Sequence, residues 1–190
     1  MEDPRELDRR ALIVLDKLVS TVTPADLERR TPCEGWTLAD LLRHQVSENR
    51  GFGAALLDGS APDWDSGELG ADPYGSYADS VDLVLATLDD DAVLDRQVTV
   101  REFGTFPGIV AVSMHLVDTV AHGWDIAGAL GLPYAQDADI VHTALKIAEQ
   151  IPADPEFRSE RGSFKPVVPT ESASELHRFL GLLGRSPDWA

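Results

Sequence analysis

Four long stretches of the chain carry apolar residues at the three- and four-residue spacing of an amphipathic helix. Each stretch begins at a capping residue or a turn and ends at a helix breaker, so each predicts one main helix. The first starts at Asp3 with a proline in its first turn, and the second begins with Thr37 and Asp40 in a capping box. The four predicted helices cover residues 4–22, 38–57, 77–88 and 109–130, and the third is capped by Ser76 with Asp79.

Shorter elements are predicted between and after these helices. The intervening residues give a helical turn from Pro24, a loop from Asp58 to Gly75, weak β character over residues 98–103 and a turn over 104–108. The residues after Gly131 predict a fifth helix over Ala138–Ile151, an extended segment at 164–168, and a final helix over Leu176–Leu183 capped by Ser172 with Glu175. No convincing sheet emerges. We therefore predict an all-α fold, a four-helix bundle with additional short helices, in one domain (residues 1–190, with a bundle core at 1–151 and a C-terminal extension at 152–190).

Charge and composition narrow the class of protein. The chain has 16 Lys and Arg against 33 Asp and Glu, a net charge of −17, which disfavours nucleic acid and anionic membrane surfaces as partners. It has no stretch of about 20 apolar residues, and its charged N-terminus lacks the pattern of a signal peptide. Its single cysteine, Cys33, excludes an intrachain disulfide. These features predict a soluble cytoplasmic protein.

The fourth predicted helix carries an unusual polar stripe. Between Pro107 and Leu130 the only ionisable residues are His115, Asp118, His122 and Asp125, spaced three, four and three apart. At about 100° per residue they fall within an arc of roughly 80°, and most other positions of this helix are apolar or small. Imidazole nitrogen and carboxylate oxygen are ligands of divalent transition metals. The stripe therefore predicts a metal site inside a helical bundle.

A third ligand has to come from another element. Asp118 and His122 are one turn apart and can reach one ion, and His44 of the second helix is the natural partner because Leu41 and Phe52 bracket it on an inward face. Three protein ligands leave coordination positions open, as in catalytic rather than structural sites. The alternative interpretation is that the stripe is the solvent face of an amphipathic helix. It is disfavoured because the stripe has two histidines and no long charged side chain.

The remaining polar residues of the stripe have supporting roles in this hypothesis. His115 is an alternative ligand in place of Asp118, whereas Asp125 or Glu48 can accept the second ring N–H of a ligand histidine. Trp36 and Trp124 are predicted as walls of the pocket. Cys33 has no histidine or basic residue close in sequence, so we interpret it as packing rather than as a nucleophile.

Two pairs of motifs resemble a known family. The run TPCEGWT at residues 31–37 with LLRH at 41–44 resembles the second-helix motif of DinB-like bundles, in particular the N-terminal domain of mycothiol-dependent maleylpyruvate isomerase. HGWDIA at 122–127 and LGRSPDW at 183–189 resemble an uncharacterised metal-binding subgroup of that superfamily. The resemblance implies a DinB-like four-helix bundle with a divalent metal, usually zinc although nickel is possible, on His44, Asp118 and His122. The isomerase has glutamate where this chain has Asp118, so either the helix lies closer or His115 substitutes.

The resemblance also implies a reaction. Similar proteins use the metal to bind a low-molecular-weight thiol such as mycothiol, which predicts a thiol transferase or isomerase acting on a reactive small molecule. Two alternatives stay open: a metal-dependent hydrolase that activates water, and a non-catalytic bundle that binds a metal or another ligand. The extended segments after Pro152 also allow a homodimer.

Overall fold

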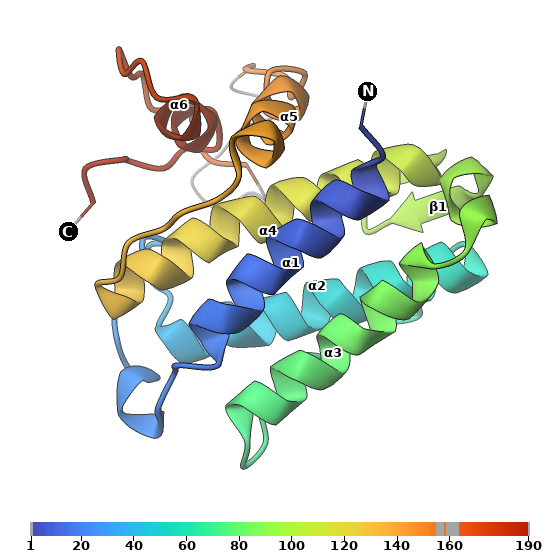
Figure 1. Ribbon diagram of the computed structural model, residues 1–190, viewed down its shortest axis with the longest axis horizontal. Coiled ribbons are helices and arrows are strands. Elements are labelled where there is room, and N and C mark those ends of the chain that lie inside the picture. The colour runs from blue at the N-terminus through green and yellow to red at the C-terminus, as the bar shows by residue number, and fades with distance from the viewer. Residues whose placement is uncertain (1, 155–157, 159–163, 190) are drawn as a thin grey trace.

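Four packed helices make up the body of the protein, the first and fourth running in one direction and the second and third in the opposite one (Figure 1). The computed structural model describes residues 2–154, 158 and 164–189. The four helices are α1 (Pro4–Val19), α2 (Leu38–Asp58), α3 (Pro73–Leu88) and α4 (Gly108–Leu130). Helix α1 packs on α4 and α3, and α2 packs on α3 and α4, so the four close a ring around one apolar core. The predicted all-α four-helix bundle is confirmed.

The helix ends follow local chemistry at most positions. Asp3 accepts a hydrogen bond from the backbone N–H of Arg5 and caps α1. Thr37 and Asp40 form the predicted capping box on α2, with Thr37 N–H 3.0 Å from the Asp40 carboxylate. Helix α4 ends at Gly131, whose φ of 68° is the left-handed conformation expected of a terminal glycine.

Four predicted boundaries differ from the structure, beginning with the end of α1, which lies at Val19 rather than at residue 22. Helix α3 begins at Pro73, since Asp72 accepts a hydrogen bond from Gly75 N–H before Ser76 can act as the cap. Helix α5 (Ala138–Ala148) stops one turn earlier than predicted. Helix α6 (Glu175–Leu182) is capped by Ser174 rather than Ser172. The helical turn from Pro24 is a single 3-10 turn, η1 (Pro24–Asp26), and a second turn, η2 (Asp91–Asp95), precedes the strands.

A small β-hairpin, not predicted as a sheet, leads into α4. Strands β1 (Gln97–Val100) and β2 (Gly104–Pro107) pair antiparallel, so the predicted turn at residues 104–108 is mostly a strand. Val98 and Val100 are buried on one side, and the hydroxyls of Thr99 and Thr105 pair across the strands at 2.9 Å. The strands are four residues each, too short for a periodic signal in the sequence.

Helices α5 and α6 lie together against the outer side of α4, near the N-terminal half of α1 (Figure 1). A second apolar cluster joins them to the bundle and includes Leu7, Leu116, Leu145 and Phe179. The predicted C-terminal extension therefore packs on the bundle where it is described. Part of that extension, residues 155–157, 159–163 and 190, lies outside the described residues. Within the described chain, none of the helices is both long and apolar enough to cross a membrane.

The loop between α2 and α3 is held against α2 by two glycines. A Cβ atom at Gly51 would lie 2.2 Å from the indole of Trp64, so only glycine lets this ring rest on the helix. A Cβ atom at Gly67 would lie 2.0 Å from the carbonyl oxygen of Arg43 on the same helix. These close approaches fix the loop next to the turn of the β-hairpin.

A buried polar cluster joins three helices at the centre of the bundle. Nδ1 of His115 lies 2.8 Å from Oδ2 of Asp8 on α1, and Nε2 lies 3.0 Å from Oδ1 of Asn49 on α2. All three side chains are almost completely buried. Burial disfavours the charged form of His115, but the Asp8 carboxylate outweighs it and raises the pKa of this histidine above 6.5.

Replacing Asp8 by alanine tests this cluster. Removing one partner of a buried ion pair costs about 3–5 kcal/mol. Because the pKa of His115 is raised in the folded state, the stability it contributes is fully present below pH 6.5 and is lost as the pH rises through the raised pKa. The Asp8→Ala variant should therefore lose more free energy of unfolding at about pH 6 than at about pH 9 in urea titrations. Glu6→Ala, at an exposed position of α1, is the control and should change little; equal losses for Asp8→Ala at both pH values would contradict the ion pair.

Candidate metal centre

Helices α2 and α4 bring three predicted ligands together. Nε2 of His44, on α2, lies 3.4 Å from Oδ1 of Asp118, on α4. Nε2 of His122, one turn further along α4, lies 3.3 Å from the same oxygen. The two imidazole rings have centroids 4.7 Å apart and planes at 71°. The ligand atoms of all three residues lie within 4.8 Å of one another.

The spacing of these atoms fits a metal better than it fits ion pairs. Hydrogen bonds between charged imidazole and carboxylate groups are about 2.7–2.9 Å long, whereas both nitrogen-to-oxygen distances here exceed 3.2 Å. Ligand atoms bound to one ion at about 2.0–2.1 Å in tetrahedral geometry lie roughly 3.3 Å from each other. Two imidazoles and one carboxylate are also a donor set that zinc accepts. These three residues can therefore hold a divalent ion with little rearrangement.

The orientation of Asp118 is set by a neighbouring amide. Its Oδ2 accepts a hydrogen bond of 2.7 Å from Nε2 of the buried Gln45, which leaves Oδ1 to face the two rings. Asp118 thus offers a single oxygen to an ion. The short aspartate side chain nevertheless approaches both rings.

His115 is not part of this group. Both of its ring nitrogens are engaged by Asp8 and Asn49 in the buried cluster, so the alternative of His115 as a ligand in place of Asp118 was wrong. The sequence could not separate the two because both lie on the same stripe of α4. The difference comes from α1, which covers the end of the stripe where His115 lies.

The second nitrogen of His122 faces a buried carboxylate. Nδ1 lies 2.8 Å from Oδ2 of Asp125, which is completely buried. A carboxylate only accepts, so Nδ1 carries the proton and donates it to Asp125. Metal-binding histidines usually have such a carboxylate on their second nitrogen, so the contact is consistent with the supporting role predicted for Asp125, which stays a prediction.

Arg185 and Cys33 complete the surroundings of Asp125. The Arg185 guanidinium donates to both carboxylate oxygens, from Nε at 3.0 Å and from Nη2 at 2.6 Å. The Cys33 thiol donates to Oδ2 at 3.2 Å. Sequence analysis missed Arg185 and gave Cys33 no basic neighbour, because these partners are 60 and 92 residues away from Asp125. The only signal for Arg185 was its place inside the motif at residues 183–189.

His44 has a looser support on its other side. Its Nδ1 lies 3.7 Å from Oε1 of Glu48, one turn along α2, and its ring lies 5.2 Å from the ring of Trp36. Trp36 therefore lies beside the three candidate ligands, and its role as a pocket wall stays a prediction. Trp124 is partly buried and packs against the cluster formed with α5 and α6, so its role as a pocket wall stays a prediction.

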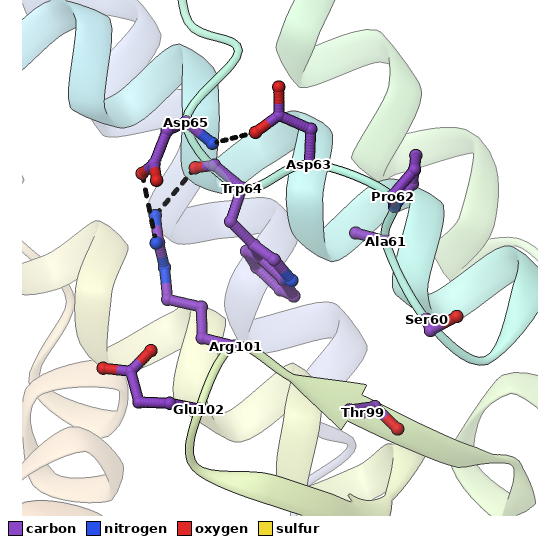
Figure 2. A pocket seen from close by; sticks show the side chains of 9 residues that line it. All are labelled: Ser60, Ala61, Pro62, Asp63, Trp64, Asp65, Thr99, Arg101 and Glu102. Atoms are coloured by element: carbon purple, nitrogen blue, oxygen red, sulfur yellow. Dashed lines mark hydrogen bonds and ion pairs between the residues drawn. The ribbon is translucent and has the colours of Figure 1, made fainter.

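An arginine from the β-hairpin holds Glu48. Arg101 donates to Oε1 of Glu48 from Nε at 3.0 Å, and also to the Trp64 carbonyl and to Asp65. Figure 2 shows this side chain rising from the end of β1 toward Trp64 and Asp65.

A cavity of about 390 Å³ lies between the α2–α3 loop and the hairpin, and none of the three candidate ligands lines it. Arg101 takes a φ of 42°, unusual for a residue with a side chain, which marks how tightly the turn is fixed.

The charges of the site act on one another strongly. Burial alone would raise the pKa of Asp118, but His122 and His44 outweigh it and hold that pKa well below the usual range. Burial likewise opposes charge on His122, yet Asp118 and Asp125 raise its pKa well above 6.5. Arg185 holds the pKa of Asp125 below the ordinary value despite burial. Burial and Asp118 together raise the pKa of Glu48. A cation at the centre, proton or metal, is therefore strongly favoured.

Comparisons with known proteins identify the family of the chain. The sequence model of the mycothiol maleylpyruvate isomerase N-terminal domain matches residues 9–127, which include all three candidate ligands. Uncharacterized protein MT0763 of Mycobacterium tuberculosis (strain CDC 1551 / Oshkosh) is 26% identical over 183 residues, covering 94% of this chain and 97% of its own. A protein of a second strain of that species matches equally well. Among solved structures, a histidine-to-alanine mutant of mycothiol-dependent maleylpyruvate isomerase superposes with a TM-score of 0.60 at 17% identity, over 77% of this chain and 67% of that one.

The raised pKa of His122 can be measured in metal-free protein. After removal of metal by a chelator, the His122 ring should stay protonated well above pH 6.5, because Asp118 and Asp125 stabilise its charge. Replacing Asp118 by asparagine should lower the pKa of His122, which a histidine NMR titration would follow. His142, on the exposed side of α5, serves as the internal reference. A His122 pKa that does not respond to Asp118→Asn would contradict the contact.

Proposed function

The chain belongs to the mycothiol maleylpyruvate isomerase N-terminal domain family, and we propose that it is a metal-dependent enzyme that uses a low-molecular-weight thiol such as mycothiol. The metal would be held by His44, Asp118 and His122, with zinc as the first candidate. The reaction would be a thiol transfer or an isomerisation that proceeds through a thiol adduct of a small electrophile. One observation carries the proposal: Nε2 atoms of histidines on two helices converge on one oxygen of Asp118.

The donor set suits activation of a thiol. Two neutral imidazoles and one carboxylate carry a single negative charge, so a divalent ion among them keeps a net positive charge. Such an ion would supply the Lewis acidity that keeps a thiol, with a free pKa of about 8.5, in its reactive thiolate form at neutral pH. Three protein ligands also leave room for an exogenous one, which is the composition of catalytic zinc sites.

The chain's own residues orient the ligands and admit the substrate. Gln45 fixes the carboxylate of Asp118, and Asp125 fixes the ring of His122 through its Nδ1 proton. The side chains of His44 and Asp118 are each 22% exposed, against 10% for His122, so a small molecule can approach from the His44 side. There the indole of Trp36 offers an apolar face next to the histidine ring.

Metal content is the first test. Protein purified without added metal should contain about one equivalent of zinc per chain, because the three ligands meet the needs of that ion. His44→Ala and His122→Ala should each lose most of it in elemental analysis. His142→Ala, whose side chain is 55% exposed on α5, is the matched control and should retain it. Equal zinc in the wild type and in both ligand variants would contradict the site.

Turnover is the second test. The wild type with metal should consume mycothiol in the presence of a panel of small electrophiles, and chelation should abolish that consumption while leaving the circular dichroism spectrum of a folded protein. Because substitutions behind a metal ligand already cost about 10–100-fold, Asp118→Ala should lower the rate by at least that much. Metal-dependent turnover that needs no thiol would instead favour hydrolysis, and its absence with every thiol tried would sink the thiol proposal.

A further inference from the structure

His122 belongs to two groups of potential ligands, one through each ring nitrogen. Its Nε2 faces His44 and Asp118, whereas its Nδ1 faces a second group made of Asp125 and Cys33. In the second group Sγ lies 3.2 Å from Oδ2 of Asp125 and 3.9 Å from Nδ1, and all three atoms lie within 4.8 Å of one another. Thiolate, imidazole and carboxylate are together a good donor set for zinc. Composition alone therefore leaves two places for one ion.

A guanidinium already fills the second place. Nη2 of Arg185 lies 2.6 Å from Oδ2 of Asp125, 3.3 Å from Nδ1 of His122 and 3.9 Å from Sγ of Cys33. This one nitrogen thus lies close to each of the three atoms of the second group that could bind a metal. The side chain is only 15% exposed, so its charge is poorly screened by water. A divalent ion among these three donors would have to displace it.

The backbone around Arg185 gives this cation a defined position. Gly184 takes a φ of 76° after α6, and a Cβ atom there would lie 2.6 Å from Cβ of Lys165, so the turn that aims Arg185 requires glycine. Arg185 N–H then donates to the carbonyl of Leu180, and its Nη1 donates to that of Leu183. Beyond it, the ring of Trp189 packs at 3.4 Å from the position a Cβ atom would take on Gly128 of α4. The C-terminal segment thereby delivers a fixed charge to the back of the site.

We propose that Arg185 is a positioning residue that reserves Nδ1 of His122 for Asp125, keeps Cys33 out of metal coordination and so directs the ion to Nε2. This inference rests on the proposed function. Held by Arg185, the Asp125 carboxylate accepts the Nδ1 proton, which leaves Nε2 as the unprotonated nitrogen that an ion needs. Without the guanidinium, the thiol, Nδ1 and Asp125 become available as a competing site.

Cobalt(II) is the probe, because a sulfur ligand adds a near-ultraviolet charge-transfer band that nitrogen and oxygen ligands do not. The wild type should bind Co²⁺ without that band, and Cys33→Ser should leave its spectrum unchanged. In Arg185→Ala the band should appear, and it should vanish in the double variant Arg185→Ala/Cys33→Ser. Arg178→Ala, which removes an arginine that is 45% exposed on α6, is the matched control and should keep the wild-type spectrum.

A second pair of variants covers a loss of folding in Arg185→Ala. Arg185→Gln removes the charge but keeps a donor for Asp125, and it should also show the sulfur band. Arg185→Lys keeps a cation and should suppress the band. The inference is overturned if Arg185→Ala and Arg185→Gln fold and bind Co²⁺ with the wild-type spectrum, or if the wild type itself has a band that Cys33→Ser removes. Failure of the proposed function is a different result: Co²⁺ binding by the wild type that Asp118→Ala does not weaken.

Discussion

The close packing of α2 against α4 is the constraint on which the site depends. It places two imidazoles and a carboxylate from different helices within a few ångströms, in a part of the bundle that is only partly open to water. Buried polar groups are tolerated only when each has a partner, and three mutually facing donors without a cation would be poorly matched. A positive charge at their centre would match these three groups. This is the physical reason for proposing a metal at this place.

The β-hairpin and the segment after α6 support the two histidines from behind. The β-hairpin carries Arg101 to Glu48 behind His44, and the segment after α6 carries Arg185 to Asp125 behind His122. Each ring therefore has a carboxylate on its Nδ1 side, and each carboxylate is compensated by an arginine from outside the four main helices. A carboxylate buried without such a partner would tend to take up a proton and stop orienting the ring. The hairpin and the C-terminal segment are in this sense part of the site, although neither supplies a ligand.

The sequence predicted the features that depend on local pattern. Capping at Asp3 and Thr37 and the glycine stop at Gly131 are decided by a few neighbouring residues, and the structure has them as expected. The polar stripe on α4 was also visible in the sequence, because a narrow polar arc stands out on a helix whose other positions are mostly apolar. What the pattern could not decide was which partner each stripe residue meets. His115 and Asp118 are equivalent by spacing, and only the position of Asp8 on α1 separates them. Arg185 was out of reach for the same reason, since its link to Asp125 spans 60 residues.

The two histidines are held unequally, and His122 is the more tightly held of the two. His122 is fixed by a contact of 2.8 Å to a carboxylate that is itself held by three hydrogen bonds from Arg185, whereas Nδ1 of His44 lies 3.7 Å from Glu48. The ring of His44 is also the more exposed of the two and lies beside Trp36. If the proposed function holds, a ligand atom entering from the exposed side would meet the less constrained histidine first. Because a coordination sphere adjusts where the restraint is weakest, we would then expect the α2 side to yield to an incoming molecule and α4, with Asp118 and His122, to stay fixed.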